Sequence, residues 1–378
     1  MAKLSEICNI QSGGTPSRSC VEYWENGKIP WVKISDIKDK ELNQTEEFIT
    51  ELGVEKSSAK LFPKGTILYS IFATLGEVCI LNIDATTNQA IAGLQLTNES
   101  VLPDYLYYYL VSKKDFVNYI GRGVAQNNIN LKILRNMEIP IPNKEEQERI
   151  VLRLNKLNQC ISLRKQQLKK LDELVKSRFI EMFGDPVNNS KGLPELTLPE
   201  LGEFGRGVSK HRPRNDPKLL GGKYPLIQTG EVANSNLYIT EYESTYSELG
   251  FKQSKLWQKG TLCITIAANI AKTAILTFDA CFPDSVVGFK ANDKTNNIFI
   301  HYWFSFFQAI LEAQAPESAQ KNINLKTLSE LKIIIPTIDL QNQFAEFVEQ
   351  TDKLKFEVKE ALKKLETLKK SLMQQYFG

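Results

Sequence analysis

The feature that most constrains this chain is a helical signal of roughly 40 residues in its middle, from about Lys144 to Phe183. No glycine or proline interrupts it before Gly184 and Pro186, which predict its end. At about 1.5 Å per residue the helix would be a rod of about 60 Å, whose apolar stripe needs a partner surface. The stripe follows the three- and four-residue spacing of one helix face, at Ile150, Leu154, Leu157, Ile161, Leu168, Leu171 and Val175.

Length and composition narrow the class of protein. The 378 residues suffice for two or three domains, and a net charge of +3 neither demands nor excludes nucleic acid. The six cysteines are scattered without a CxxC pair, which favours reduced thiols over a zinc site or a disulfide framework. The N-terminus lacks an apolar signal core, and no apolar run approaches about 20 residues. We therefore predict a soluble cytoplasmic protein without a metal site.

The chain contains an internal repeat. LFPKGTILYSIFATLGEVCILNIDA begins at Leu61, and LWQKGTLCITIAANIAKTAILTFDA begins 195 residues later at Leu256. QNNINLKILRNMEIPIP from Gln126 matches QKNINLKTLSELKIIIP from Gln320. A third pair, EEQERI and DLQNQF, opens two long helical segments. Each half is therefore predicted to be one globular domain followed by one long helix.

The predicted fold class is α+β: two repeated α+β domains separated by a long antiparallel two-helix coiled coil. The predicted bounds are 1–143 and 187–336 for the domains, and 144–186 and 337–378 for the helical spacers. Each stripe could instead pack on its own globular domain or on a partner. The second stripe comprises Phe344, Phe347 or Val348, Leu354, Val358, Leu362, Leu365, Leu368 and Leu372.

Within each half, strands and helices alternate. KGTILYSIFA and EVCILNID read as strands, as do KGTLCITIAA and KTAILTFD. DYLYYYLVSKKDFVNYI, from Asp104, and its counterpart IFIHYWFSFFQAILEA each predict one helix. At helical spacing their aromatic stripes favour a core role over a base-stacking platform. NLKILRNMEIPIP predicts a short helix that leads into a final strand.

Motifs for catalysis are missing from the sequence. It has no GxGxxG after a strand, no GxxxxGK[ST] loop, no HExxH, no GxSxG, and no Asn-Pro-Pro-aromatic motif. Asp36-Ile-Lys38 resembles part of a nuclease motif, but its counterpart, Gly230-Glu231-Val232, lacks the lysine. We therefore predict no catalytic residues.

Polar loops in both halves suggest DNA contacts. Flexible cations in a loop rich in glycine and proline suit DNA phosphates, although such a loop can also be plain solvated surface. A polar, glycine-rich loop at the corresponding place in both halves favours the DNA-binding interpretation. The candidates are Thr15, Ser17 and Arg18 in the first half, and Arg206, Lys210, His211, Arg212 and Arg214 in the second.

A second polar cluster also occurs twice. Asparagine and glutamine amides can pair with adenine, and arginine with guanine, so these loops are candidates for base reading. The alternative is that asparagines cap the following short helix, and for Asn130 and Asn324 capping is the favoured role. The candidates are Arg122, Gln126, Asn127 and Asn128, and then Gln320, Lys321 and Asn322; Lys33, Gln228 and Lys272 complete the predicted DNA contacts.

These segments together resemble a known family. LSEICNIQSGGTPS, YWENGKIPWVKISDI, KGTILYSIFATLGEVCI and NMEIPIPNKEEQERI look like a target-recognition domain of a type I restriction-modification specificity (S) subunit. The resemblance covers essentially the whole chain. It implies a non-catalytic subunit whose two domains each read half of a bipartite site on double-stranded DNA, while the coiled coil fixes the unread gap.

The resemblance also implies partners. Two modification subunits would bind S-adenosylmethionine and methylate adenine, and two restriction subunits could add ATP- and Mg-dependent translocation and cleavage, all in a prokaryotic cytoplasm. This chain itself would bind no cofactor. The second half departs from the family pattern because its opening lacks the GGTPS form. The alternatives are a fused enzyme, a coiled-coil scaffold that binds protein only, and a specificity subunit of a methyltransferase-only or related restriction system.

Overall fold

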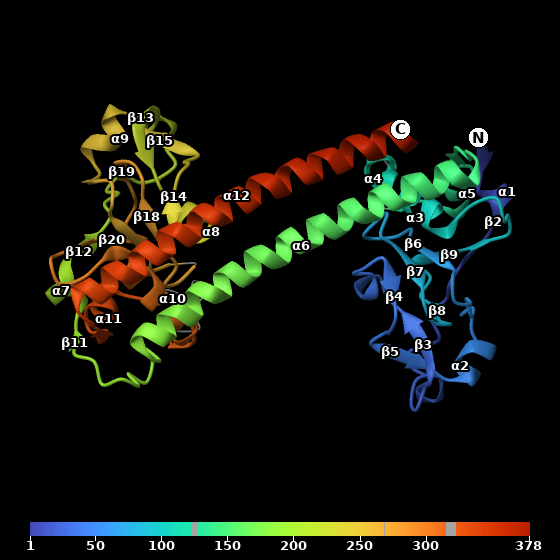
Figure 1. The fold of residues 1–378 in the computed structure, drawn as a ribbon, viewed down its shortest axis with the longest axis horizontal. Coiled ribbons are helices and arrows are strands. Elements are labelled where there is room, and N and C mark those ends of the chain that lie inside the picture. The colour runs from blue at the N-terminus through green and yellow to red at the C-terminus, as the bar shows by residue number, and fades with distance from the viewer. Residues whose placement is uncertain (122–127, 268, 315–322) are drawn as a thin grey trace. The chain divides into compact units, whose positions relative to one another are not determined.

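The computed structural model describes residues 1–121, 128–267, 269–314 and 323–378. They form two compact units, the first from Met1–Lys165 with Glu360–Gly378 and the second from Gln166–Lys359. Both chain termini lie in the first unit (Figure 1). Within the described ranges no helix is both long and apolar enough to cross a membrane.

The two long helices are α6 (Lys144–Phe183) and α12 (Ile338–Phe377), and each contributes one half to each unit. The remaining elements of the first unit are β1 (Ala2–Lys3), α1 (Leu4–Ile7), β2 (Cys8–Ser12), η1 (Val21–Tyr23), β3 (Ile29–Val32), η2 (Ile34–Asp36), β4 (Glu41–Leu42), β5 (Glu47–Ile49), α2 (Glu51–Glu55), β6 (Ile67–Ser70), β7 (Val78–Leu81), β8 (Thr86–Thr87), β9 (Ile91–Leu96), α3 (Pro103–Ser112), α4 (Lys114–Gly121), α5 (Leu131–Arg135) and β10 (Glu138–Ile139).

The second unit repeats this order with small additions. Its elements are β11 (Glu195–Leu196), α7 (Leu198–Leu201), β12 (Gly202–Arg206), η3 (Pro217–Leu219), β13 (Leu220–Leu226), α8 (Thr229–Asn234), β14 (Tyr238–Ile239), β15 (Ser244–Tyr246), α9 (Glu248–Lys252), β16 (Leu256–Trp257), β17 (Leu262–Thr265), β18 (Thr273–Leu276), β19 (Ala280–Cys281), β20 (Val286–Ala291), α10 (Asn297–Gln314), α11 (Leu325–Ser329) and β21 (Ile333–Ile334).

Corresponding sheets have the same strand order. The five-stranded sheet β2-β9-β6-β7-β4 of the first unit matches β12-β20-β17-β18-β14 of the second. A smaller sheet accompanies each, β5-β3-β8 in the first unit and β15-β13-β19-β16 in the second. The predicted α+β class and the duplication are therefore confirmed.

A buried glutamine fixes the start of each long helix. Gln147 is fully buried; its side-chain oxygen accepts from the Leu102 amide at 3.0 Å, and its Nε2 donates to the Ser100 and Pro142 carbonyls at 2.8 and 2.9 Å. This amide has hydrogen-bond partners at both its oxygen and its nitrogen, as a buried amide requires. It ties the first turn of α6 to the loop before α3.

Gln341 repeats this arrangement at the start of α12. Its oxygen accepts from Thr295 Oγ1 at 2.9 Å and from the Asn296 amide at 3.0 Å. Its Nε2 donates to the Lys294 and Pro336 carbonyls at 3.1 and 2.9 Å. The two helices therefore leave their globular domains through matching contacts, with the Thr295 hydroxyl as an addition at α12.

The far end of each helix packs in the other half's domain. Phe183, at the end of α6, contacts Phe299 and Phe344 in the second unit, with ring centroids 5.1 and 5.5 Å apart. Phe377, at the end of α12, packs on Tyr105 of the first unit, with ring centroids 5.2 Å apart. Each unit thus buries one helix start and one helix end.

Within both units the two helices pack antiparallel, as predicted. In the first unit Arg153 bonds to the Tyr376 hydroxyl at 3.1 Å, and Lys165 pairs with Glu366 at 3.3 Å. In the second, the Phe179 and Phe344 rings lie 5.4 Å apart. Side chains of the two helices therefore contact each other within each unit, and the helix ends also pack into the cores of the globular domains.

Two details of the predicted elements were wrong. The helix predicted from Asp104 is divided at Lys113 into α3 and α4; the Lys113 amide caps α3 by donating to Leu110 and Val111. The second stripe was predicted to include Leu354 and Leu368, which are 51% and 49% exposed. A straight helix drifts relative to a strict heptad, so a buried stripe does not keep one register over a 40-residue helix.

The aromatic stripes form core, as predicted. Tyr105, Tyr108 and Tyr109 of α3 are almost fully buried, and so are Phe299 and Trp303 of α10. Burial raises the pKa of the Tyr105 hydroxyl to about 12. None of these side chains is available to stack on a base.

We expect Gln341→Leu to lower the free energy of unfolding by about 3 kcal/mol, because buried donors and acceptors lose their partners. Urea unfolding followed by circular dichroism measures this change. Gln343→Leu, two residues away and exposed, is the matched control and should leave stability nearly unchanged. Equal stability of the two variants would contradict an anchoring role for Gln341.

Candidate nucleic-acid interface

The polar loop of the first unit begins immediately after β2. The Gly13 amide donates to the Ile91 carbonyl at 3.0 Å, and the Gly14 amide donates to the Thr87 carbonyl at 2.9 Å. A Cβ on Gly13 would lie 2.0 Å from Thr87 Oγ1, so this close approach requires glycine. The buried Trp31 Nε1 donates to the Gly14 carbonyl at 3.1 Å. The glycines thus fix where the loop leaves the sheet.

The basic loop of the second unit leaves its sheet in the same way. The Gly207 amide donates to the Val286 carbonyl at 2.8 Å, and the Val208 amide donates to the Phe282 carbonyl at 3.0 Å. Both contacts correspond to those of the first unit. The two loops therefore occupy equivalent positions, although the second lacks the GGTPS sequence.

The cations of the first unit form a cluster around one carboxylate. Glu47 pairs with Arg18 at 2.6 Å and with Lys33 at 2.8 Å. The Arg18 guanidinium lies 3.6 Å from the centroid of the Trp24 ring. Arg18 holds the pKa of Glu47 below its usual range, and the hydrogen bond to Glu47 raises the pKa of Lys33. Arg18 and Lys33 are therefore both ordered by Glu47.

The cations of the second loop also have an acidic partner. Asp284 pairs with Arg212 at 3.6 Å and with Arg214 more closely. The Lys210 and His211 amides both donate to Gln253 Oε1, at 2.6 and 3.0 Å. These contacts hold the loop in one shape, while the Lys210 side chain is exposed.

His211 lies within this loop, and Arg206 lies on the strand before it. His211 Nε2 lies 3.1 Å from Asp216 Oδ2. A hydrogen bond from the Lys218 amide is the main cause of the lowered pKa of Asp216. Arg206 is exposed on the edge strand β12.

The remaining predicted DNA contacts outside the amide-rich loops differ in their hydrogen bonds and in their place in the fold. Thr15 Oγ1 donates to Gln89. The Ser17 hydroxyl lies 2.8 Å from that of Ser19. Gln228, like Lys33 in the first unit, caps the short helix that follows it, and Lys272 lies in the turn between β17 and β18.

The amide-rich loops are described only in part. The described member, Asn128, lies in an antiparallel bridge with Phe72. Asn130 and Asn324 cap α5 and α11 through their side-chain oxygens, at 2.9 and 2.8 Å, which confirms the favoured role. Arg122, Gln126, Asn127, Gln320, Lys321 and Asn322 lie outside the described residues.

Sequence reasoning missed the acidic partners. Asp284 lies 70 residues from Arg214 and Glu47 lies well outside the loop of Arg18, so no local spacing signals either contact. Among the described residues, no group of three or more histidine, cysteine or acidic side chains could hold a metal ion.

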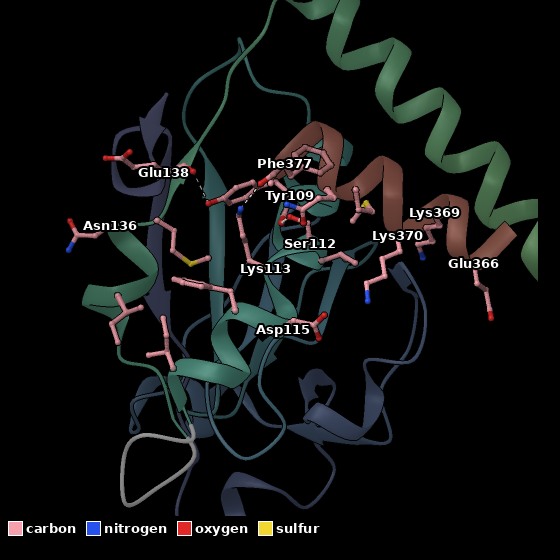
Figure 2. A pocket seen from close by; sticks show the side chains of 18 of the residues that line it. Tyr109, Ser112, Lys113, Asp115, Asn136, Glu138, Glu366, Lys369, Lys370 and Phe377 are labelled. Carbon is pink, nitrogen blue, oxygen red and sulfur yellow. Dashed lines mark hydrogen bonds between the residues drawn. The ribbon is translucent and has the colours of Figure 1, made fainter. Parts of the chain in front are cut away.

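A cavity of about 1080 Å³ lies in the first unit beside the end of α12. Figure 2 shows Lys113, Lys369 and Lys370 around it, together with Tyr109 and Phe377. Lys113 Nζ donates to the Phe377 carbonyl at 2.5 Å, and burial lowers the pKa values of Lys113 and Lys369. The cavity combines an apolar wall with cations, and Asn130 at the end of the amide-rich loop also lines it.

The known proteins that this chain resembles are type I restriction-modification specificity subunits. A family profile described as "Type I restriction modification DNA specificity domain" matches residues 1–173 and 195–369. The type I restriction enzyme MjaIX specificity subunit of Methanocaldococcus jannaschii is 33% identical over 272 residues, which cover 67% of this chain and 62% of that relative. The EcoprrI specificity subunit of Escherichia coli is 25% identical over 379 residues, 93% of this chain and 87% of the relative.

Solved structures have the same fold. A chain from a study of complex assembly and conformational transition in the type I restriction-modification system matches with a TM-score of 0.63 and 18% identity, over 100% of this chain and 96% of that one. The S subunit from M. genitalium matches with a TM-score of 0.57 and 16% identity, over 100% and 95% of the two chains. At these identities the likeness concerns the fold.

Proposed function

This chain belongs to the type I restriction-modification DNA specificity family, and from that membership we propose that it selects the DNA sequence on which partner subunits act. One observation carries the proposal: two copies of one scaffold, anchored by Gln147 and Gln341 in the same way, present different polar loops. Two different surfaces on one scaffold suit a bipartite, asymmetric DNA site. Each domain would read one half of it.

We propose that the domains 1–143 and 187–336 read the half-sites and that the helical segments 144–186 and 337–378 set the gap between them. Gln147 and Gln341 anchor the start of each helix, and the end of each helix packs in the other half's domain. These contacts support this division because they fix the direction of both helices. A helix of 40 residues is about 60 Å long, which corresponds to one to two turns of duplex at about 3.4 Å per base pair.

We propose that modification subunits dock on the helices. Large apolar side chains remain exposed there, including Leu152 and Leu163 of α6 and Phe356 of α12. Such side chains give a docking subunit apolar surface to bury. The cavity beside Phe377 offers further apolar surface in the first unit (Figure 2). Restriction subunits could join the same assembly.

Catalysis is proposed to belong to the partners. S-adenosylmethionine would be bound by the modification subunits, and ATP and Mg by restriction subunits, all in a prokaryotic cytoplasm. The rival function is a coiled-coil scaffold that binds protein only. The exposed cations of the second unit's loop favour DNA, since phosphate contacts are built from such side chains.

We expect the purified chain alone to leave DNA unmethylated, and the chain mixed with its modification subunits and S-adenosylmethionine to methylate adenine within one bipartite motif. Sequencing that detects methylated adenine in a random-sequence DNA library measures both outcomes. Methylation by the chain alone would contradict a non-catalytic role. A motif without two separated halves would contradict two-domain reading.

Replacing Lys210, Arg212 and Arg214 together by alanine should weaken DNA binding by the assembled complex and flatten its salt dependence. Each lost phosphate contact reduces the magnitude of the negative slope of log K against log salt by about one. The exposed Lys259, Lys290 and Lys294 of the second unit, which lie outside both this loop and the long helices, provide a control with equal charge loss when replaced together. An unchanged slope in the loop variant would exclude this loop from the interface.

A further inference from the structure

The turn between β6 and β7 projects three exposed residues from the large sheet of the first unit. Phe72, Ala73 and Thr74 are exposed, whereas Ile71 and Leu75 on either side are buried. Phe72 is 39% exposed, although it lies two residues after the end of β6, a strand whose residues are fully buried. An aromatic side chain at a turn tip has no core to fill. Its exposed face is available to contact a partner molecule.

A buried hydroxyl braces the turn. Ser70 Oγ donates to the Thr74 carbonyl at 2.5 Å and accepts from the Glu77 amide at 2.8 Å. The Ser70 backbone also bonds to Glu77 and Gly76, at 2.9 and 3.1 Å. Within the turn, Ala73 has a φ of 59°, a conformation that non-glycine residues rarely adopt and that is found at binding sites.

The second unit contains the same brace 195 residues later. Thr265 Oγ1 donates to the Asn269 carbonyl and accepts from the Lys272 amide at 3.0 Å. The Thr265 backbone bonds to Lys272 and Ala271, at 2.9 and 2.8 Å. Ala271, at the position of Gly76, has a φ of 57°. The scaffold of the turn is therefore maintained in both halves.

The exposed tips differ although their braces agree. Ala267 stands at the position of Phe72, and Asn269 stands at that of Thr74. Asn269 is exposed. The brace uses no tip side chain, so it leaves the chemistry of each tip open. Two tips with different chemistry on one brace suit two different contacts.

Each turn is also joined to the amide-rich loop. The Ile129 amide donates to the Ile71 carbonyl at 3.0 Å, and the Ile323 amide donates to the Ile266 carbonyl at 2.9 Å. In the first unit Asn128 and Phe72 form a bridge. The turn tip and the start of the predicted base-reading segment thus lie together.

The charge beside each tip is compatible with DNA. In the first unit Glu77 pairs with Lys114 at 2.6 Å, which neutralises the acid behind the tip. In the second unit the corresponding residue is Lys272, a cation. Neither tip therefore presents an uncompensated carboxylate of its own to a phosphate backbone.

We propose that these two turns enter the major groove and read bases: Phe72 contacts the methyl group of a thymine in one half-site, and Asn269 pairs with an adenine in the other. The inference rests on the proposed function and assigns specificity to residues within it. A narrow turn fits a groove about 12 Å wide, and phenylalanine with thymine and asparagine with adenine are established chemical matches.

Phe72→Ala tests the proposal in the complete complex with its modification subunits. Methylated adenines are mapped in a random-sequence DNA library for the original chain and for the variant. We expect the preference at one position of one half-site to fall by about tenfold, with the other half-site unchanged. Replacing thymine by uracil at that position should weaken the original complex and leave the variant unaffected.

Asn269→Ala should relax the other half-site only. Leu61→Ala is the control, because Leu61 is 52% exposed and precedes β6 at the end away from the turn. An unchanged motif in Phe72→Ala, or a uniform loss of methylation without a change in the motif, would overturn the inference and leave the proposed function standing. The absence of any bipartite motif from the original chain would instead overturn the proposed function.

Discussion

The structure depends on two buried side-chain amides, Gln147 and Gln341. Each lies in the first turn of a 40-residue helix and bonds to backbone groups of the preceding globular domain through both its oxygen and its nitrogen. Any other direction for the helix would leave several buried polar groups without partners, which costs free energy for each one. The two similar anchors therefore give both helices the same direction relative to the globular domain that precedes each one.

A helix this long also needs a partner for its apolar face, and the repeat supplies it. Phe179 and Phe183 of α6 join the second unit's core, whereas Phe377 of α12 joins that of the first. Neither half of the chain therefore completes its own core. The stability of each unit therefore requires residues from both halves. The side chains at a helix end have to fit the core of the domain in which they pack.

The sequence predicts the helices, the duplication and the core aromatics because each depends on local spacing repeated over many residues. It does not predict the division of α3 from α4 at Lys113, which depends on one local cap, or the exposure of Leu354, which depends on helix drift. For the candidate interface, it identifies cations such as Arg214 but not their acidic partner Asp284, because a contact across 70 residues leaves no local pattern.

The same distinction explains why base-reading residues are hard to recognise. Residues that hold the scaffold, such as Ser70 and its counterpart Thr265, keep similar chemistry because the brace needs a hydroxyl. Tip residues such as Phe72 and Asn269 differ because each would meet a different base pair. A candidate base-reading position is therefore one at which the two halves have the same backbone contacts but different exposed side chains. Neither half alone carries that signal, because one exposed phenylalanine on a surface is ordinary.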